Sequence, residues 1–381
     1  MNPDADICHI TTVHPPFDQR IFFRECVSAS TIYSTTLICH YNKKEEIIKD
    51  VKIVSIGKNK TRTLSLKIFD RLITNLHAIK KSLEKNYVIY HLHDPELIIV
   101  GFIIKKLIRR KVIFDCHEDY LGYIQQRVGL KNYQRKILLF IFRNIEKLAI
   151  RNFDVIITAD QGMGNRYLEF GAKKVEVIFN FPRLEFFNYF PEPESTEYDL
   201  VYNGSIPRYH LNISFDVAEE LIKRGHYLKW YFFGRCPEIE WARSVIIKRN
   251  LEKYFFILPS VSHDQVSIEI RKAKIGFIPL PDLPKFKHNI PTKLFEFMAL
   301  GMPTVLSDLP PSREFVGDGK CAIMVDPNDV NAYANAIIKL MKNRAMRISM
   351  GVEGRKKIEN HYNWKNEEAK LLRLYSELLN E

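Results

Sequence analysis

Two charged residues in the second half of the chain, Lys293 and Glu296, have the types and spacing expected for binding a phosphorylated ligand. They follow Pro291 at the start of a helix that the apolar spacing predicts near Thr292–Ala299, with Gly301 beyond its end. A helix start offers free backbone N–H groups and the positive end of the dipole, which suits a diphosphate, and Lys293 adds a positive charge there. The Glu296 carboxylate lies about one turn further on, where it could accept hydrogen bonds from vicinal ribose hydroxyls. The pair predicts a nucleotide site, although an isolated Lys-x-x-Glu spacing also suits a surface helix.

Polar residues in the first half follow two predicted strands. His93 and Asp94 come directly after the strand predicted at Tyr87–His91. A histidine at a strand end beside an aspartate is well oriented, and its polar tip has no reason to enter the core, so we expect His93 to contact a ligand. The next predicted strand, Lys111–Asp115, is followed by three polar residues, His117, Glu118 and Asp119. We expect these to shape a ligand pocket, and a cap for the following helix is an alternative for one of them.

A third polar group, His14, Asp18 and Arg20, lies in the segment HPPFDQRIFFRE between the first predicted strand and the first helix. Ligands of open parallel sheets bind outside the carboxyl ends of the strands, so these residues are expected at the same site. An ion pair between Asp18 and Arg20 at the helix start stays open as the structural alternative.

Short apolar runs alternate with longer helical stretches along the chain, which is the pattern of parallel α/β sheets. Three helices are expected in the first half, at Arg20–Ser30, Leu66–Leu83 and Tyr133–Asn152. Further strands are predicted at Asp6–Thr11, Thr35–Cys39, Val155–Thr158 and Val175–Ile178, and in the second half at Tyr198–Tyr202, Leu228–Phe233, Phe255–Leu258, Ile275–Pro279, Pro303–Leu306 and Ala322–Val325. Further helices are expected near Ile213–Arg224, Glu238–Asn250 and His263–Lys272.

The chain of 381 residues predicts two α/β domains. A proline-rich, acidic stretch at Asn180–Thr196 has the composition of a linker. The expected division is an N-terminal domain at 1–190, a C-terminal domain at 191–360, and a closing helix at 361–381 that crosses back onto the first domain.

The segment at the start of the helix predicted near Thr292, HNIPTKLFEFMALGMP, resembles the donor-site signature of glycosyltransferase family 4. That signature has the form Pro-x-Lys-Leu-x-Glu-x-Met-Ala-x-Gly-x-Pro. The resemblance extends over essentially the whole chain and implies a GT-B fold, in which two Rossmann-like domains face each other across a cleft. It implies a retaining glycosyltransferase of the bacterial surface-polysaccharide type, such as those of lipopolysaccharide or capsule synthesis. Its donor would be a nucleotide-diphosphate sugar held by the C-terminal domain.

The resemblance also assigns roles to residues. His93, Lys293 and Glu296 would lie at the reaction centre. The residues on the acceptor side would be His14, Asp18, Arg20, Asp94, His117, Glu118 and Asp119. The family often has a glutamate where this chain has His288, and an arginine where it has Ser205, so Arg208 is retained as the phosphate ligand. The residues implied to contact the donor are Gly204, Arg208, Gly234, Arg235, Pro259, Ser260, Val261, His288, Asn289, Ile290, Pro291, Thr292, Lys293 and Glu296.

The charge distribution bears on the acceptor. The chain has a formal net charge of +12, and residues 1–190 carry most of it. The predicted helix Tyr133–Asn152 and the segment Ile103–Lys111 both combine apolar and basic side chains. Such a combination suits binding to an anionic membrane surface. The alternative is a core helix with a solvated basic face. We therefore expect a saccharide acceptor, linked to a polyprenyl diphosphate, and no nucleic acid, because no nucleic-acid-binding module is present.

No cofactor and no metal are expected. The only Asp-x-Asp, at Asp4–Asp6, precedes the first strand, and no phosphate-binding GxxxxGK[ST] loop occurs. The six scattered cysteines and the absence of an apolar leader favour a cytoplasmic protein, with peripheral attachment to the inner membrane face as a further expectation. Two alternatives to a transferase stay open: a GT-B protein that binds a sugar nucleotide without turnover, and a sugar-nucleotide epimerase or hydrolase.

Overall fold

The computed structural model describes all residues except 1–4, 58–63, 117–131, 190–195 and 288–290. The chain forms two compact units, which are described separately below. The first contains residues 1–180 together with 365–381, and the second contains residues 181–364. The boundary therefore lies before position 190, at the beginning of the proline-rich stretch rather than within it.

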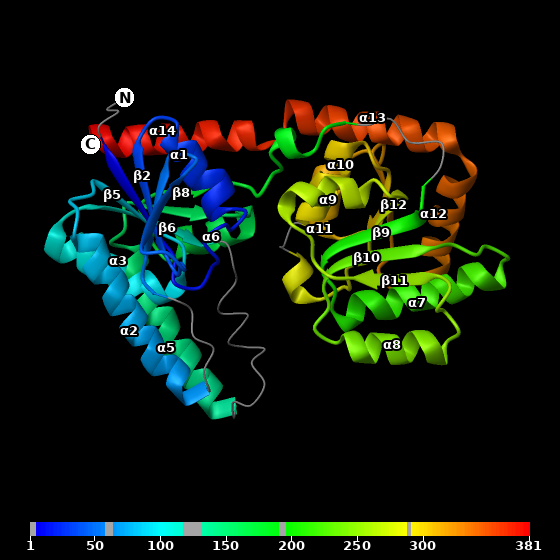
Figure 1. Cartoon of the computed structure of the whole chain (residues 1–381), viewed down its shortest axis with the longest axis horizontal. Helices are drawn as coiled ribbons and strands as arrows, with labels where there is room; N and C mark the ends of the chain where they lie inside the picture. Colours follow the sequence, from blue (N-terminus) through cyan, green and yellow to red (C-terminus); the bar gives the residue numbers. More distant parts are fainter. Residues whose placement is uncertain (1–4, 58–63, 117–131, 190–195, 288–290) are drawn as a thin grey trace. The chain divides into compact units, whose positions relative to one another are not determined.

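The first unit is built on an eight-stranded sheet in the order β3-β4-β2-β1-β5-β6-β7-β8 (Figure 1). Every neighbouring pair is parallel except β3 with β4. The strands are β1 (Asp6–Ile10), β2 (Ser34–Cys39), β3 (Glu45–Ile48), β4 (Val51–Ser55), β5 (Ile89–Leu92), β6 (Lys111–Cys116), β7 (Val155–Thr158) and β8 (Val175–Val177). The helical segments are η1 (Ile21–Cys26), α1 (Val27–Ser30), α2 (Leu64–Leu83), η2 (Pro95–Leu97), α3 (Ile98–Ile103), η3 (Ile104–Ile108), α5 (Asn132–Ile150), α6 (Gln161–Glu169) and α14 (Trp364–Asn380).

The antiparallel hairpin of β3 and β4 was not expected from the sequence. Its turn places Lys49 and Asp50 at φ angles of 49° and 59°, in the left-handed region. Such turns are normally signalled by glycine or asparagine, and a Lys-Asp pair gives no such signal. The predicted strands of this unit are otherwise present to within a few residues, and most of their side chains are buried.

The second unit contains a six-stranded, fully parallel sheet in the order β11-β10-β9-β12-β13-β14 (Figure 1). The strands are β9 (Tyr198–Ser205), β10 (Trp230–Arg235), β11 (Phe255–Leu258), β12 (Ala273–Ile278), β13 (Thr304–Ser307) and β14 (Ala322–Val325). The helical segments are η4 (Leu184–Phe186), α7 (Arg208–Lys223), α8 (Ile239–Lys248), α9 (His263–Ile270), η5 (Pro284–Lys287), α10 (Thr292–Leu300), α11 (Pro310–Val316), α12 (Val330–Lys342) and α13 (Arg344–Asn360). The core of this unit contains Trp230, Phe255 and Phe277, with Tyr333 of α12 packed on them.

Helix α10 begins and ends as its sequence predicts. Pro291 is the residue before its first turn and has an extended conformation. Gly301 ends the helix at a φ of 74°, and the N–H of Met302 donates to the carbonyl of Phe297 at 2.8 Å. A β-carbon at Gly301 would lie 2.4 Å from the ring of Tyr189, so glycine is required there both by conformation and by space.

The last helix, α14, belongs with the first unit from residue 365 onward. Trp364, at its start, is buried, and its N–H donates to the carbonyl of Pro182 at 2.9 Å. Further along, the Tyr375 hydroxyl lies 2.8 Å from the His91 ring on β5. No helix in the part of the chain that the structure describes is both long and apolar enough to cross a bilayer.

Candidate functional site

The start of α10 in the second unit carries the two charged residues singled out in the sequence. The Glu296 carboxylate is half-buried, and its Oε2 accepts a hydrogen bond from Asn203 Nδ2 at 2.7 Å. Asn203 is on β9 and buried, and its Oδ1 has no hydrogen-bond partner within the described part of the chain. Asn203 was missed in the sequence, where its position at a strand end, directly before Gly204, was the available signal.

Lys293 is half-buried, with its Nζ 4.7 Å from the centre of the Tyr202 ring. Burial lowers the pKa of Lys293, and the Glu296 carboxylate partly opposes that shift. Among the residues that the structure describes, no carboxylate lies within ion-pair distance of this ammonium group. A half-buried cation without a counter-ion, one turn from a held carboxylate, is suited to an anionic ligand.

The carboxyl ends of β9 and β10 approach each other closely at two of the predicted glycines. A β-carbon at Gly234 would lie 1.9 Å from the carbonyl oxygen of Gly204, and Gly234 has a φ of +142°. Gly204 is itself at a φ of +98°, with open space where a β-carbon would be. The two glycines therefore leave backbone, rather than side chains, at this edge of the sheet, and Arg235 beside them is exposed.

Arg208 begins α7 and is half exposed. Its Nε lies 2.6 Å from the Glu238 carboxylate, and its guanidinium is 4.7 Å from the centre of the Trp241 ring. To bind a diphosphate, this side chain must leave Glu238, and its assignment stays a prediction.

The loop between β11 and α9 contains the residues expected to meet the base. Pro259 and Ser260 are exposed, and Val261 is half-buried. Ser262 precedes the first turn of α9 and His263 begins it, as their position in the sequence predicts. The remaining predicted donor residues His288, Asn289 and Ile290, and the acceptor-side residues His117, Glu118 and Asp119, lie outside the described residues.

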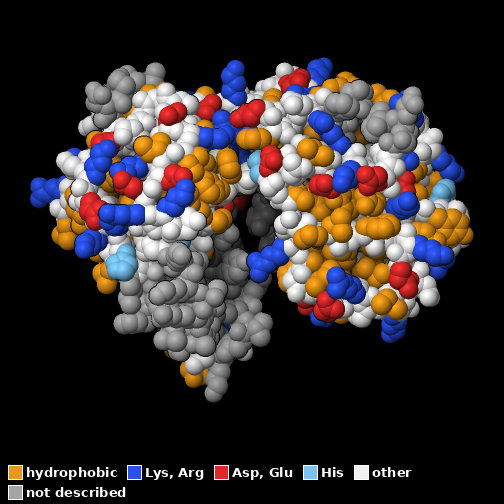
Figure 2. Space-filling model, viewed as in Figure 1, with side chains coloured by type: hydrophobic (Ala, Val, Ile, Leu, Met, Phe, Trp, Pro, Cys, Tyr) orange, Lys and Arg blue, Asp and Glu red, His pale blue; other side chains and the backbone are white. Residues whose placement is uncertain are grey.

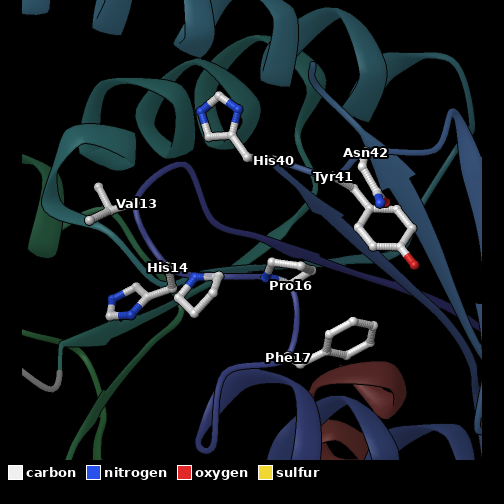
Figure 3. A pocket seen from close by; sticks show the side chains of 8 residues that line it. Val13, His14, Pro16, Phe17, His40, Tyr41 and Asn42 are labelled. Atoms are coloured by element: carbon white, nitrogen blue, oxygen red, sulfur yellow. The ribbon is translucent and has the colours of Figure 1, made fainter. Parts of the chain in front are cut away.

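In the first unit, the loops after β1 and β2 enclose a pocket of about 530 Å³ (Figure 3). His14, Pro16 and Phe17 line it from the β1 loop, and Tyr41 lines it from the β2 loop. The Phe17 and Tyr41 rings meet edge to face at 6.0 Å, and Phe17 remains 39% exposed. An exposed aromatic ring beside polar groups suits the face of a sugar.

The histidine of this pocket, His14, lies between two carboxylates. Its Nδ1 is 3.6 Å from Asp18 Oδ2, and its Nε2 is 3.5 Å from Asp94 Oδ1. Asp18 also accepts the backbone N–H groups of Arg20 and Ile21 at the start of η1. The pKa of Asp18 is lowered well below its usual value, because these hydrogen bonds and His14 outweigh the opposing effect of burial.

Asp94 and Arg20 are placed differently from the sequence expectation. Asp94 is fully buried, and its Oδ2 accepts from Thr11 Oγ1 at 2.9 Å and from the Val13 N–H at 3.3 Å, so it holds the β1 loop in place. The Arg20 side chain points into the interior, where it binds both oxygens of Asp115 at 2.7 and 2.8 Å. Arg20 therefore does not face the acceptor side, and its side chain forms no ion pair with Asp18. The reason is that the nearby buried carboxylates attract the guanidinium inward.

His93 is also turned into the interior, so the expectation that its polar tip stays out of the core is wrong. The side chain is 1% exposed, its Nδ1 lies 3.2 Å from Asp115 Oδ2, and its Nε2 lies 3.0 Å from His9 Nδ1. The physical reason is that β6 and β1, on either side of β5, supply polar partners that the local sequence around His93 does not reveal. Its contact with a sugar stays a prediction.

Comparison with known proteins agrees with this arrangement. The model described as Glycosyltransferase Family 4 matches residues 33–186, and the model described as Glycosyl transferases group 1 matches residues 186–357. The chain belongs to the glycosyltransferases of family 4 with a GT-B fold, as the donor-site signature indicated.

Two relatives share part of the sequence. The poly(ribitol-phosphate) alpha-N-acetylglucosaminyltransferase of Staphylococcus aureus is 22% identical over 250 residues, which are 62% of this chain and 47% of the relative. The 2-deoxystreptamine N-acetyl-D-glucosaminyltransferase of Niallia circulans is 26% identical over 38% of this chain and 36% of its own length. The chain thus spans about half, or less, of these relatives.

Solved structures match over nearly the full length. The sucrose-phosphate synthase of Thermosynechococcus elongatus has a TM-score of 0.75 at 17% identity and covers 99% of both chains. Anabaena HepE in complex with UDP-glucose has a TM-score of 0.70 at 12% identity, covering 98% of this chain and 99% of the other. These similarities establish the fold.

Proposed function

We propose that the protein is a retaining glycosyltransferase that moves a sugar from a nucleotide-diphosphate sugar to a saccharide acceptor. The observation that carries this proposal is the start of α10, where Lys293 lacks a counter-ion among the described residues and Asn203 holds the Glu296 carboxylate at 2.7 Å. An ammonium group and a helix N-terminus match a diphosphate, and a held carboxylate matches ribose hydroxyls. The solved neighbour bound to UDP-glucose supports the same class of donor.

In the proposed reaction, Lys293 and the α10 start stabilise the negative charge that grows on the leaving diphosphate. No paired acids of the kind used by retaining hydrolases are evident in the sequence, so the departing diphosphate would accept the proton of the incoming hydroxyl. The protein then contributes charge stabilisation and alignment, and we propose that no metal takes part.

The acceptor is proposed to bind at the pocket of the first unit. His14 offers a hydrogen-bonding group there, with the Asp18 carboxylate 3.6 Å from its Nδ1, and the exposed Phe17 ring offers an apolar surface for a sugar face. Two relatives are named as transferring N-acetylglucosamine, to poly(ribitol-phosphate) and to 2-deoxystreptamine, which supports a polyol or saccharide acceptor.

We further propose that the acceptor is lipid-linked, in surface polysaccharide synthesis, and that α5 brings the protein to an anionic membrane. Phe140 is 72% exposed and Ile137 is 55% exposed on this helix, with Lys136 and Arg143 also exposed. In Figure 1 the start of α5 extends away from the sheet, and Figure 2 shows a small hydrophobic patch at the tip of that end of the unit. Exposed apolar and basic side chains on one helix are typical of interfacial binding. In the neighbouring segment, Lys105 is already paired with Asp154 at 2.6 Å.

The donor assignment is tested with a thermal-shift panel of UDP-, GDP-, ADP- and CMP-sugars. A ligand that binds only the folded protein raises its melting temperature, so one nucleotide class should stabilise the protein selectively. Glycosyl transfer from that donor, with and without EDTA, then separates transfer from hydrolysis and from binding without turnover, and tests the proposed independence of metal. The proposal fails if no sugar nucleotide binds, or if the Lys293→Ala/Glu296→Ala double variant binds as well as the unchanged protein.

A further inference from the structure

Three histidines lie buried together on the sheet of the first unit. His9 on β1 and His91 on β5 are register partners, and His93, directly after the end of β5, is two residues beyond His91. All three rings are at most 1% exposed. Four short contacts join them into a continuous chain, called here the histidine chain. Its members are Asp115, His93, His9, Tyr375 and His91, in that order, with separations of 3.2, 3.0, 3.3 and 2.8 Å.

One end of the histidine chain can only accept hydrogen bonds. The Asp115 carboxylate is bound on both oxygens by the Arg20 guanidinium, at 2.7 and 2.8 Å, and is therefore ionised. His93 must donate its Nδ1–H to it. A neutral imidazole has one donor and one acceptor nitrogen, so the Nε2 of His93 must accept, and the donor to it is the Nδ1–H of His9.

The same rule fixes the remaining members. Since His9 donates through Nδ1, its Nε2 accepts the hydroxyl proton of Tyr375. The Tyr375 oxygen then accepts the Nδ1–H of His91. All three histidines therefore carry their proton on Nδ1, and the direction of every bond follows from the single carboxylate of Asp115.

The surrounding charges are consistent with three neutral imidazoles. Burial lowers the pKa values of His9 and His91, and the charge of a protonated His93 would lower both further. Burial and the neighbouring Asp115 raise the pKa of Glu25, which lies on η1. With Glu25 protonated, Arg20 and Asp115 balance each other, and the buried group has no net charge.

A divalent metal is the competing occupant of this region. Ligand atoms of His9, Glu25, His91 and His93 all lie within 4.8 Å of one another, and the oxygens of Glu25 have no hydrogen-bond partner within the described part of the chain. However, His9 and His93 already face each other at hydrogen-bonding distance. The Arg20 Nε also lies 3.0 Å from Glu25 Oε1, which places a positive charge beside the only carboxylate of the set. The geometry favours the hydrogen-bonded chain.

We propose that Tyr375 is a positioning residue for sugar transfer, because its hydroxyl donates to His9 Nε2 and so keeps the Nδ1–H of His9 directed at His93 Nε2. The inference rests on the proposed function. A sugar hydroxyl that reaches His93 would donate to Nε2 in place of the His9 N–H. Because one donor replaces another, no proton would have to move on the His93 ring. The last helix thus helps to hold the ring that faces His93, whereas Asp115 sets the tautomer of His93 itself.

The test compares two single-hydroxyl deletions, Tyr375→Phe and Tyr33→Phe. Tyr33 is buried, and its ring contacts the Tyr375 ring edge to face at 6.0 Å, so it is a matched control for packing. The ring nitrogens of His9 and His93 are followed by ¹⁵N NMR, without substrate. In the unchanged protein and in Tyr33→Phe, both rings should be protonated on Nδ1. Tyr375→Phe should show mixed tautomers for His9, with His93 still protonated on Nδ1, and a kcat lower by about tenfold at unchanged donor KM.

Three results would overturn the proposal. They are a proton on Nε2 of His93 in the unchanged protein, a kcat for Tyr375→Phe equal to that of Tyr33→Phe, or one equivalent of zinc that is lost in Glu25→Gln. Failure of the proposed function looks different. The unchanged protein would then transfer no sugar from any donor, which removes the role of Tyr375 in transfer, while the ring spectra still decide whether the histidine chain exists.

Discussion

Asn203 Nδ2 donates a hydrogen bond to Glu296 Oε2 at 2.7 Å, which joins the end of β9 to the first turns of α10. The bond leaves the other carboxylate oxygen, Oε1, available to a ligand. Because a carboxylate held by one amide loses little further freedom on binding, Asn203 prepares Glu296 for its proposed partner.

Changing Asn203 to Ala should weaken binding of the sugar nucleotide about tenfold or more, since a hydrogen bond to a charged group contributes about 1.5–3 kcal/mol. Calorimetric titration with the donor found in the nucleotide panel measures this. Asn203→Asp should be worse, because it places a second carboxylate against Glu296. Equal affinity in all three proteins would contradict the positioning role.

Changing Lys293 to Met should reduce the affinity for the free nucleoside diphosphate much more than the affinity for the nucleoside. The reason is that the ammonium group is proposed to meet the phosphates and not the base. Lys287→Met is a suitable control, because Lys287 is exposed and paired with Asp282 at 3.1 Å. A parallel loss for diphosphate and nucleoside would show that Lys293 acts on the fold rather than on the ligand.

Changing Gly234 to Ala should destabilise the second unit by about 2 kcal/mol or more, because a β-carbon would overlap the Gly204 carbonyl at 1.9 Å. Gly225→Ala serves as the control, since Gly225 also has a positive φ, +79°, but open space around it. Thermal unfolding of the two variants separates the overlap from the conformational strain. Equal melting temperatures of the two variants would mean that the ends of β9 and β10 move apart at little cost in free energy.

Changing Glu25 to Gln should raise the melting temperature above neutral pH and leave it unchanged near pH 4. The raised pKa of Glu25 means that the folded protein holds this proton at pH values where the unfolded chain has lost it. The contribution of Glu25 to the free energy of unfolding is therefore fully present at pH values below its ordinary pKa of 4.5. It falls as the pH rises toward the pKa in the folded protein. Glutamine cannot lose a proton and should remove that decline. A variant less stable than the unchanged protein at pH 8 would indicate an ionised Glu25.

Changing Phe140 to Ser should reduce binding to vesicles that contain anionic phosphatidylglycerol, because α5 would lose an exposed ring that is proposed to enter the bilayer surface. Co-sedimentation measures the bound fraction. Tyr227→Ser removes an aromatic ring that is 63% exposed in the second unit and should have no effect. Equal loss in both variants, or binding to neutral vesicles alone, would count against docking through α5.

Most of the architecture was predictable from the sequence because it depends on local signals. The strands of parallel sheets are short buried apolar runs, and the boundaries of α10 are marked by Pro291 and Gly301. The hairpin of β3 and β4 was missed because Lys49 and Asp50 adopt left-handed conformations that their types rarely signal.

The predicted residues of the second unit share one edge because the carboxyl ends of parallel strands coincide. Gly204 and Gly234 lie at the carboxyl ends of β9 and β10, and the hydrogen bond between Asn203 and Glu296 brings the start of α10 to the same edge. The first unit was less predictable. Arg20, Asp94 and His93 were expected to face a ligand, and each is turned inward by partners more than 20 positions away in the chain.

The sequence by itself determined the two α/β units, the family and the helix that carries Lys293 and Glu296, because each depends on residues close together along the chain. The tertiary structure alone decided which polar side chains are buried and what they bind. Asp115 and Tyr375 meet the histidines through strand order and helix packing, which bring together residues far apart in sequence. Burial then makes each of those hydrogen bonds necessary, because an unpaired polar group in the interior is costly.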